Sequence, residues 1–378
     1  MRDVTRLTDF PPPPLRLGGE PLPTVGRVRV YVCGITPYAV THLGHASTFL
    51  WSDLAARVLR ATGSAVELTR NVTDVDESLL AEARRRHEPY DQLATRQRFA
   101  FDRTMEALRV RLPDREPTAR QAVAQVIQLV QALLLRGAAY ERNGTVYARA
   151  TAAAARAGVD PDEALRLAAE YGDEPDDPAK ESPLDVVVWK GATDDADVSW
   201  PSRWGPGRPG WHAQCTAMVL SSYGSGVDLH AGGADLRFPH HAVEALLGEA
   251  ATGVAPFSRA WLRPGVVSYA GAKMAKSTGN LVLVEDLLES ASPAAIRLLC
   301  LDRPWRQPWE YEPAALQGAA ERVEALYAAA SHPGGSMTAV QEVDAALLDD
   351  LDVERAIDTA VEAGGAAARR VIDVCQLH

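Results

Sequence analysis

The stretch YVCGITPYAVTHLGHASTFL, Tyr31–Leu50, places a cysteine at the end of a predicted strand and two histidines at the start of a predicted helix. Before it, valines alternate along RVRVYVCG, and from Thr41 the segment THLGHASTFLWSDLAARVLRATG carries apolar residues at helical spacing until Gly63. A buried strand that leads into a helix is typical of a parallel α/β sheet. The stretch therefore predicts an α/β fold whose first strand-to-helix turn carries Cys33 and the HLGH histidines.

This turn has the chemistry of a phosphate site. Ligands of open parallel sheets bind beyond the carboxyl ends of the strands, and a helix N-terminus presents free N–H groups to phosphate. His42 and His45 can donate hydrogen bonds to phosphate oxygens, and Gly44 lets a nucleotide approach the backbone closely. Surface histidines that happen to begin a helix would give the same four letters, so the turn alone leaves both interpretations open.

The composition favours a soluble protein with small or neutral partners. The 378 residues suffice for two or three domains, and a net charge of −11 opposes a broad basic surface for nucleic acid. The cysteines show no CxxC spacing, which is typical of a reducing compartment: Cys33, Cys215, Cys300 and Cys375. The start MRDVTRLTDFPPPP lacks the apolar core of a signal peptide, and apolar runs are short. We expect a cytoplasmic protein without a membrane contact.

The order of predicted elements indicates a parallel sheet with an insertion. AVELTRNVTDVDE reads as a second strand, followed by helices over about Ser78–Leu112 and Thr118–Gly137. The pattern then weakens into alanine-rich helix and acidic loop before the strand-like LDVVVWK. The expected divisions are an extended Pro/Gly-rich leader (1–26), the first half of the sheet (27–137), an inserted connective subdomain (138–182), the second half of the sheet (183–265), a lysine-loop region (266–310) and a C-terminal helical domain (311–378).

A second motif, GAKMAKSTGN, places Lys273 and Lys276 three residues apart between glycines. Two ammonium groups on such a loop can be brought to the negative charge that develops on pyrophosphate. An ordinary solvated lysine loop would have the same composition. The lysines therefore indicate a pyrophosphate site only when they are considered together with the HLGH turn.

In their order and separation, HLGH and KMAKS resemble the paired signatures of class I aminoacyl-tRNA synthetases. Five longer strings narrow the resemblance to the cysteinyl-tRNA synthetase family: CGITPY, NVTDVDE, WGPGRPGWHAQC, GGADLRFPHH and KMAKSTGNLVLV. CGITPY and GPGRPGWH are most similar to its mycothiol-pathway branch, which contains cysteine:glucosaminyl-inositol ligases. The resemblance covers about Val28–Tyr327. It implies a class I synthetase-like fold, which is a HUP-type Rossmann sheet with an inserted subdomain, a stem-contact region around the lysine loop and a truncated helical domain.

The family recognises cysteine through zinc, and the resemblance implies ligands at Cys33, Cys215, His240 and Glu244. His240 and Glu244 lie four residues apart and share a helix face, so both can reach one ion. Zinc binds a thiolate far better than a hydroxyl, so an open coordination position selects cysteine over serine. By spacing alone, the two cysteines would be ordinary buried thiols.

The resemblance also implies which residues hold cysteinyl-AMP. Those expected at the adenylate and the amino acid are Gly34, Ile35, Thr36, Thr48, Asn71, Val72, Thr73 and Trp211. Those expected at the ribose and the adenine are Gly233, Ala234, Asp235 and Val267. Trp211 could equally be a core residue, Thr73 a helix cap and Asp235 a turn residue.

The reaction implied by the resemblance has two steps and uses ATP with Mg²⁺. The carboxylate of cysteine attacks the α-phosphate, while the HLGH histidines and Lys273 and Lys276 stabilise the departing pyrophosphate. A small amine, with glucosaminyl-inositol of mycothiol biosynthesis as the leading candidate, then takes the cysteinyl group. The acidic helical tail after Pro304 has no basic stripe, so we expect no tRNA partner. The alternatives are a paralogue with another amine or a carrier-bound acceptor, and an inactive paralogue that binds cysteinyl-AMP or a protein.

The sequence departs from the family pattern at several polar positions. Ala39 and Ala242 replace an aspartate and a glutamate, Gln214 replaces a glutamate, and Ala275 replaces the serine of KMSKS. EYGDEP, at 170–175, matches the ERGGDP string of the mycothiol ligases only loosely. The zinc ligands are all retained. This contrast predicts that cysteine is still activated, while the acceptor or the residues that support the ligands have changed.

Overall fold

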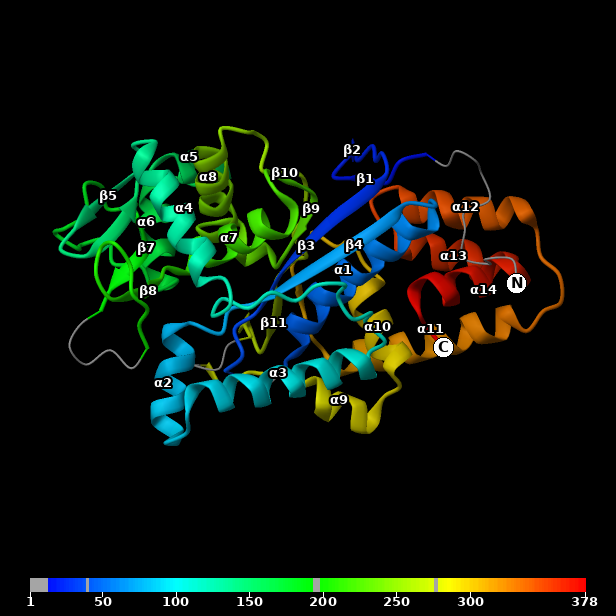
Figure 1. Ribbon diagram of the computed structural model, residues 1–378. Helices are drawn as coiled ribbons and strands as arrows, with labels where there is room; N and C mark the ends of the chain where they lie inside the picture. The colour runs from blue at the N-terminus through cyan, green and yellow to red at the C-terminus, as the bar shows by residue number, and fades with distance from the viewer. Residues whose placement is uncertain (1–12, 39–40, 193–197, 275–277) are drawn as a thin grey trace.

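The computed structural model describes residues 13–38, 41–192, 198–274 and 278–378 (Figure 1). Its centre is a parallel sheet with the strand order β10-β9-β3-β4, which confirms the predicted α/β class. The strands are β3 (Arg27–Ile35), β4 (Ala65–Val72), β9 (Val227–Ala231) and β10 (Ser258–Leu262). Their carboxyl ends meet at one edge of the sheet, and helix α1 (Leu43–Ala61) begins at this edge after β3.

Helix α1 packs between the sheet and α10 (Pro293–Leu301). Arg297 of α10 is fully buried, and its guanidinium donates to a carboxylate oxygen of Asp53 on α1 over 3.3 Å. The same guanidinium donates to the backbone carbonyls of Leu108 and Cys375 over 2.6 and 2.8 Å. A buried charge needs such partners, so this set of hydrogen bonds fixes α1 and the turn at its start.

The single helix expected over 78–112 is two helices, α2 (Glu77–Arg86) and α3 (Tyr90–Ala107). Helix α2 ends at His87, whose φ is 53°, in the left-handed region. Pro89 follows and disfavours helical backbone in the residue before it. The helix expected over 118–137 is α4 (Val123–Leu135).

An antiparallel sheet with the order β5-β6-β7-β8 interrupts the parallel one. Its strands are β5 (Ala139–Arg142), β6 (Thr145–Ala148), β7 (Val186–Gly191) and β8 (Gly207–Pro209). Helices α5 (Ala152–Ala157) and α6 (Pro161–Glu170) connect β6 to β7, and α7 (Trp211–Tyr223) and α8 (His240–Thr252) share its core. The range expected for the second half of the parallel sheet, 183–265, therefore begins with two strands of the antiparallel sheet. LDVVVWK contains the strand that its composition predicted, but this strand pairs with β6, about 40 residues earlier in the chain, and not with the parallel sheet.

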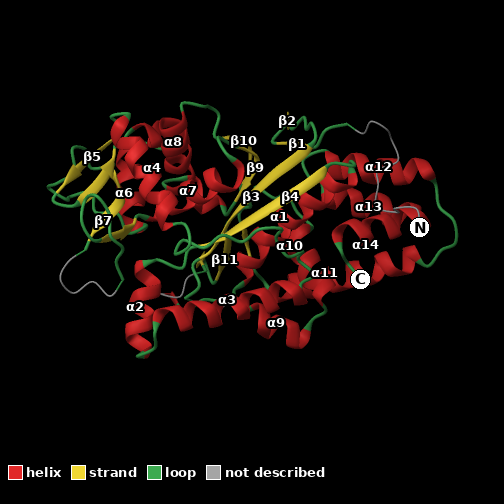
Figure 2. Cartoon of the chain, in the orientation of Figure 1, coloured by secondary structure: helices red, strands yellow, loops and turns green. Residues whose placement is uncertain are grey.

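The last part of the chain is largely helical, as the periodicity predicted. After the 3₁₀ turn η1 (Ala234–Arg237), a small sheet contains β11 (Val267–Tyr269), β12 (Ala272–Lys273) and β13 (Trp309–Glu310). Figure 2 shows a helical bundle beyond the parallel sheet, on the side opposite the antiparallel sheet. Its helices are α11 (Pro313–Ala330), α12 (Met337–Leu348), α13 (Val353–Ala363) and α14 (Gly365–Cys375), while α9 (Val284–Ser290) precedes α10. Among the described residues, no helix is both long enough and apolar enough to span a bilayer.

The described part of the N-terminal segment is packed against the body of the protein. Strands β1 (Arg16–Leu17) and β2 (Glu20–Pro21) form a short antiparallel pair. Leu15 and Leu22 on either side of it are buried and belong to the main hydrophobic core. The expectation of an unpacked leader is therefore wrong for residues 13–26, because the Pro/Gly-rich composition obscured leucines that have apolar surface to bury.

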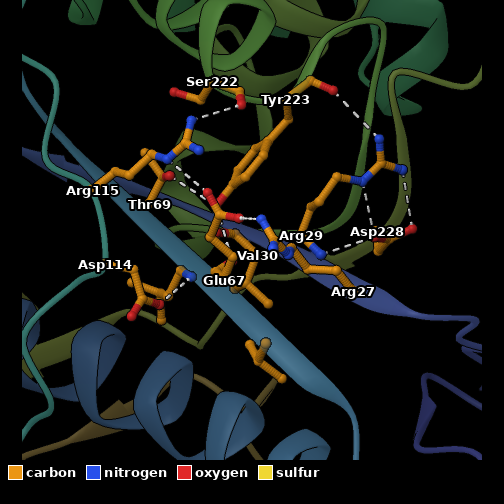
Figure 3. Close-up of polar contacts among 12 residues, drawn as sticks. Arg27, Arg29, Val30, Glu67, Thr69, Asp114, Arg115, Ser222, Tyr223 and Asp228 are labelled. Carbon is orange, nitrogen blue, oxygen red and sulfur yellow. Dashed lines mark hydrogen bonds and ion pairs between the residues drawn. The ribbon is translucent and has the colours of Figure 1, made fainter.

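A polar network joins β4 to the end of α7 (Figure 3). The Tyr223 hydroxyl lies 2.8 Å from the Thr69 hydroxyl and 2.9 Å from the backbone carbonyl of Glu67. The Glu67 carboxylate also pairs with Arg115 over 2.7 Å. Because α7 also carries Cys215, these contacts hold that cysteine in register with the sheet.

Candidate active site

A cavity of about 840 Å³ opens at the carboxyl edge of the parallel sheet. Its walls come from the ends of β3 and β4, one face of α2, the first turns of α1, α7 and α8, and the segment through β11 and β12. Most residues that the sequence assigned to ligands line it: Cys33, Gly34, Ile35, Thr36, His42, His45, Thr48, Asn71, Thr73, Trp211, Cys215, Gly233, Asp235, His240, Val267 and Lys273. The fold thus gathers residues that are up to 240 positions apart, from Cys33 to Lys273, around one cavity.

Three of the assigned residues that the structure describes are not on the cavity wall. Val72 is buried in the main hydrophobic core, because successive strand residues face opposite sides and its two neighbours take the cavity side. Ala234 lies beside the cavity, with its backbone N–H bonded to a neighbouring loop. Glu244 is completely buried behind the wall, and Lys276 lies outside the described residues.

Cys33, Cys215 and His240 of this wall converge with Glu244, which lies behind it. Their potential ligand atoms all lie within 4.8 Å of one another, and all four side chains are buried. The Cys33 sulfur is 3.7 Å from Oε2 of Glu244, and the same oxygen is 3.6 Å from Nε2 of His240. Two sulfurs, an imidazole and a carboxylate form a donor set that is typical of Zn²⁺.

The electrostatics of this quartet also fit a cation. Burial raises the pKa of the Cys33 thiol and of the Glu244 carboxyl well above their usual values. Burial lowers the pKa of His240, so its imidazole is neutral and keeps a lone pair. Oε1 of Glu244 is buried without a hydrogen-bond partner among the described residues. A divalent ion would supply the missing positive charge and a partner for that oxygen, so the residues fit zinc.

A second group of donors shares Cys33 and Glu244 but adds His230 and His241. Burial lowers the pKa of His241, so this imidazole is neutral. Nε of Arg263 donates to Nδ1 of His241 over 3.1 Å. A neutral imidazole that accepts at Nδ1 carries its proton on Nε2, so His241 has no free lone pair for a metal. The hydrogen bonds therefore favour the quartet with Cys215 and His240.

Two residues of α7 orient His240. Its Nδ1 lies 2.8 Å from Nδ1 of His212, and the Trp211 ring stacks on it with a centroid distance of 4.2 Å and an interplanar angle of 13°. When Nδ1 of His240 donates to His212, Nε2 faces the quartet without a proton, which is how metal-bound histidines are held in place. The sequence analysis named Trp211 but missed His212. Its signal was its position three residues before Cys215, on the same helix face.

His42 and His45 stack at the start of α1, with ring centroids 3.8 Å apart. Burial and the neighbouring His45 lower the pKa of His42 to about 3, and burial and Lys273 lower the pKa of His45 to about 4. Both rings are therefore neutral at physiological pH and offer N–H donors to an anion. A Cβ at Gly44 would lie 3.0 Å from the His42 ring, so glycine lets this ring lie against the backbone.

Lys273 lines the same cavity as the HLGH turn and contacts Asp235 and Tyr171. Its ammonium lies 2.7 Å from a carboxylate oxygen of Asp235 and 3.3 Å from the Tyr171 hydroxyl. Although burial opposes it, the charge of Asp235 raises the pKa of Lys273. The backbone N–H of Leu43, at the start of α1, donates to the carbonyl of Val282, just beyond the lysine loop, over 2.8 Å. Tyr171 was missed by the sequence analysis, although it lies in the EYGDEP string that only loosely matched the family.

Asn71 connects the quartet to the first turn. Its side-chain oxygen accepts from the Gly34 N–H over 2.9 Å, and its amide nitrogen donates to the Cys215 sulfur over 3.4 Å. A Cβ at Gly34 would lie 1.6 Å from the Asn71 carbonyl, so only glycine fits there. The Thr36 and Thr73 hydroxyls are 2.8 Å apart and continue the same wall.

Two departures from the family pattern have a structural account. The side-chain nitrogen of Gln214 donates to the carbonyls of Val75 and Pro209 over 2.7 and 3.1 Å. A glutamate could not donate to either carbonyl, so the amide suits this site. Ala242 is buried on α8 and packs in the core shared with the antiparallel sheet. Ala39 and Ala275 lie outside the described residues.

Comparison with known sequences points to one family. The profile of the tRNA synthetases class I (C) catalytic domain matches residues 22–321. An L-cysteine:1D-myo-inositol 2-amino-2-deoxy-alpha-D-glucopyranoside ligase of Thermobispora bispora is 43% identical over 338 residues, which cover 88% of this chain and 83% of that protein. The ligase of the same name from Parafrankia sp. is 44% identical over 347 residues, with 90% and 78% covered.

Solved structures agree with these matches at the level of the fold. The methionyl-tRNA synthetase of Mycobacterium tuberculosis in complex with methionyl-adenylate is similar with a TM-score of 0.63 and 19% identity, over 93% of this chain and 82% of that chain. A putative arginyl tRNA synthetase of Campylobacter jejuni has a TM-score of 0.54 and 14% identity, over 94% and 84%. At such identities the likeness concerns the fold alone.

Proposed function

The chain belongs to the family of tRNA synthetases class I (C) catalytic domains, and we propose that it is an ATP-dependent ligase that activates L-cysteine as cysteinyl-AMP and joins it to a small amine. The leading amine is glucosaminyl-inositol, which the names of relatives 40–44% identical to this chain contain. The product would be the cysteinyl amide of mycothiol biosynthesis.

One observation carries this proposal. The buried quartet of two cysteines, a histidine and a glutamate lies in the wall of the same cavity that holds the HLGH turn and Lys273. A thiol-selective site beside a phosphate-binding helix N-terminus is what the adenylation of cysteine needs. Neither feature by itself would distinguish this reaction from the many other uses of a parallel α/β sheet.

Cysteine selection is assigned to the quartet. Cys33, Cys215, His240 and Glu244 would hold Zn²⁺, whose affinity for a thiolate over a hydroxyl separates cysteine from serine. The protein keeps this region dry, because all four side chains are buried. Trp211 stacks on His240 and lines the cavity, and it would exclude water from the bound amino acid.

Adenylate formation is assigned to the opposite part of the cavity. An oxygen of the cysteine carboxylate attacks the α-phosphorus of ATP, and the bond to the β-phosphate breaks so that pyrophosphate leaves. The neutral His42 and His45 donate hydrogen bonds to the phosphates, and Lys273 offsets the growing negative charge. The Asp235 carboxylate would accept from ribose hydroxyls, and in the structure it contacts the Lys273 ammonium over 2.7 Å.

Transfer follows from the same intermediate. The nitrogen of the amine attacks the cysteinyl carbonyl, the bond to AMP breaks, and the amine loses a proton as the amide forms. Since this step needs an amine beside the adenylate carbonyl, the acceptor must enter next to the cysteine part of the cavity.

The first half of this function has a direct test. With purified protein, ATP, Mg²⁺ and no tRNA, we expect cysteine to drive the exchange of labelled pyrophosphate into ATP. The same assay with serine, which differs only in the hydroxyl, should be slower by about 10⁴-fold, because a site built for a specific polar group rejects an analogue that lacks it by this order.

Two results would count against the proposal. Equal exchange with serine would mean that the quartet does not select the thiol. A complete lack of exchange by zinc-loaded protein would favour the alternative of an inactive paralogue, which binds the adenylate without forming it.

A further inference from the structure

A second cavity of about 280 Å³ adjoins the first one. Both are lined by Ser78, at the start of α2, and by Trp211, so the two spaces meet at these side chains. The second cavity lies between α6, β7 and the loop that follows α6. Its volume lies near the small end of the range of about 300–1,000 Å³ for small-molecule sites, which indicates a compact ligand.

Buried polar groups without partners line this second cavity. Gln214 is 2% exposed, and its nitrogen is fixed by two backbone carbonyls. Its oxygen, Oε1, is therefore the free acceptor, and it has no partner among the described residues. Oδ2 of Asp173 is likewise buried and unpartnered within the described chain, whereas Oδ1 accepts from Lys180 over 3.0 Å. Buried acceptors without donors indicate a ligand that supplies hydroxyl or N–H groups.

The charge of the wall selects among such ligands. Its carboxylates outnumber its basic groups, with Asp76, Glu77, Asp173, Glu174 and Asp177 against Lys180, Lys190 and Arg208. Lys180 pairs with Asp173, and both Lys190 and Arg208 pair with Glu77. The remaining negative charge attracts an ammonium group and repels a phosphate or a nucleic-acid backbone.

Aromatic rings complete the wall. The Tyr171 and Trp211 rings lie 6.2 Å apart between centroids and are inclined by only 23°. Tyr147 also lines the cavity, and its hydroxyl donates to Asp177 over 2.7 Å. A few placed polar groups among flat apolar surfaces are typical of a site for a small polar ring.

We propose that this second cavity is the acceptor site and that it takes a compact polyhydroxylated amine. The assignment rests on the proposed cysteine ligase function and adds where the acceptor binds. The hydroxyls of such a molecule would donate to Gln214 and Asp173, and its amine would reach the adenylate past Ser78 and Trp211. Tyr171, at the junction, contacts Lys273 and so lies between the two sites.

A carboxylate substitution with a matched control tests the polar contacts. Asp173→Asn keeps an oxygen for Lys180 but replaces the unpartnered acceptor with an NH₂ group. We expect the dissociation constant of glucosaminyl-inositol to rise by about tenfold or more, because a buried acceptor becomes a misplaced donor. Binding is measured by calorimetry on protein saturated with a non-hydrolysable sulfamoyl analogue of cysteinyl adenylate. Asp176→Asn, an exposed position three residues further along the same loop, should leave this constant unchanged.

A steric pair tests the location independently. Ala168 on α6 is 2% exposed and lines the cavity, whereas its neighbour Ala169 is exposed to solvent. Ala168→Leu fills part of the space and should weaken binding of the same amine by at least about tenfold, while Ala169→Leu should not. Circular dichroism and the melting temperature of each variant show whether it folds.

The outcomes separate this inference from the proposed function. The proposed acceptor site would be overturned if folded Asp173→Asn and Ala168→Leu proteins bound glucosaminyl-inositol as tightly as the wild type. It would also be overturned if the wild type did not bind this amine. We expect glucosaminyl-inositol to bind more tightly than its N-acetyl form. Tighter binding of the N-acetyl form would also contradict the proposed acceptor site. Loss of cysteine-dependent pyrophosphate exchange in the wild type would instead refute the proposed function, because that assay contains no acceptor.

Discussion

Replacing Cys215 by alanine is expected to remove the bound zinc and to reduce cysteine-dependent pyrophosphate exchange by at least about 1,000-fold, equivalent to about 4 kcal/mol of transition-state stabilisation. Cys215 supplies one of two sulfurs in the quartet and receives a hydrogen bond from Asn71 over 3.4 Å. With one sulfur lost, the three remaining donors would hold zinc much more weakly. Zinc content is measured by atomic emission, and exchange is measured at saturating ATP.

The chain contains a matched control for this substitution. Cys300 is also a completely buried thiol, but it lies on α10 in the main hydrophobic core. Cys300→Ala removes the same atom and should leave zinc content and exchange as in the wild type. Full exchange by a zinc-free Cys215→Ala protein would show that the quartet does not select cysteine.

Replacing Lys273 by alanine is expected to slow adenylate formation by about 100- to 1,000-fold, the usual cost of losing one group aimed at developing charge. Because this charge is needed as pyrophosphate leaves, the affinity for cysteine should change little. Rapid-quench single turnover gives the rate of adenylate formation, and equilibrium binding gives the affinity. A normal rate, or an equal loss in rate and affinity, would contradict this role.

Asp235 provides the means to separate two explanations for that loss. In the structure Lys273 is 2.7 Å from Asp235, so removing the lysine also leaves that carboxylate without its ion pair. Lys273→Ala is therefore combined with Asp235→Asn in a double-mutant cycle. If Lys273 acts only as the ion-pair partner of Asp235, adding Asp235→Asn should restore the rate of adenylate formation. A role at the phosphates predicts that the Lys273→Ala defect persists in both backgrounds.

The HLGH turn was predictable because its signal is local. Alternating valines ended at Cys33, a helix began after His42, and a parallel sheet places both at its carboxyl edge. The metal quartet was not predictable from spacing. Cys33 and Cys215 belong to β3 and α7, and only the resemblance to a family linked them before the structure brought them within reach of one ion.

What the sequence missed depends on contacts between distant segments. The antiparallel sheet extends to Pro209 because β7 pairs with both β6 and β8. Two helices separate β6 from β7, so no local pattern reveals their pairing. Tyr171 and His212 lie inside quoted strings, but the strings did not show what these side chains contact: Lys273 and His240, respectively. The second cavity could not be read from the sequence either, because its wall combines residues from α2, α6, β7 and α7.

The central claim is that this chain joins cysteine to a small amine, and one measurement tests it directly. Purified protein is incubated with ATP, Mg²⁺, cysteine and glucosaminyl-inositol, and the products are quantified by mass spectrometry. The account predicts the cysteinyl amide and AMP in equal amounts, with neither formed when cysteine is omitted. Cysteine-dependent exchange without any amide, or the charging of cysteine tRNA in its place, would contradict the account.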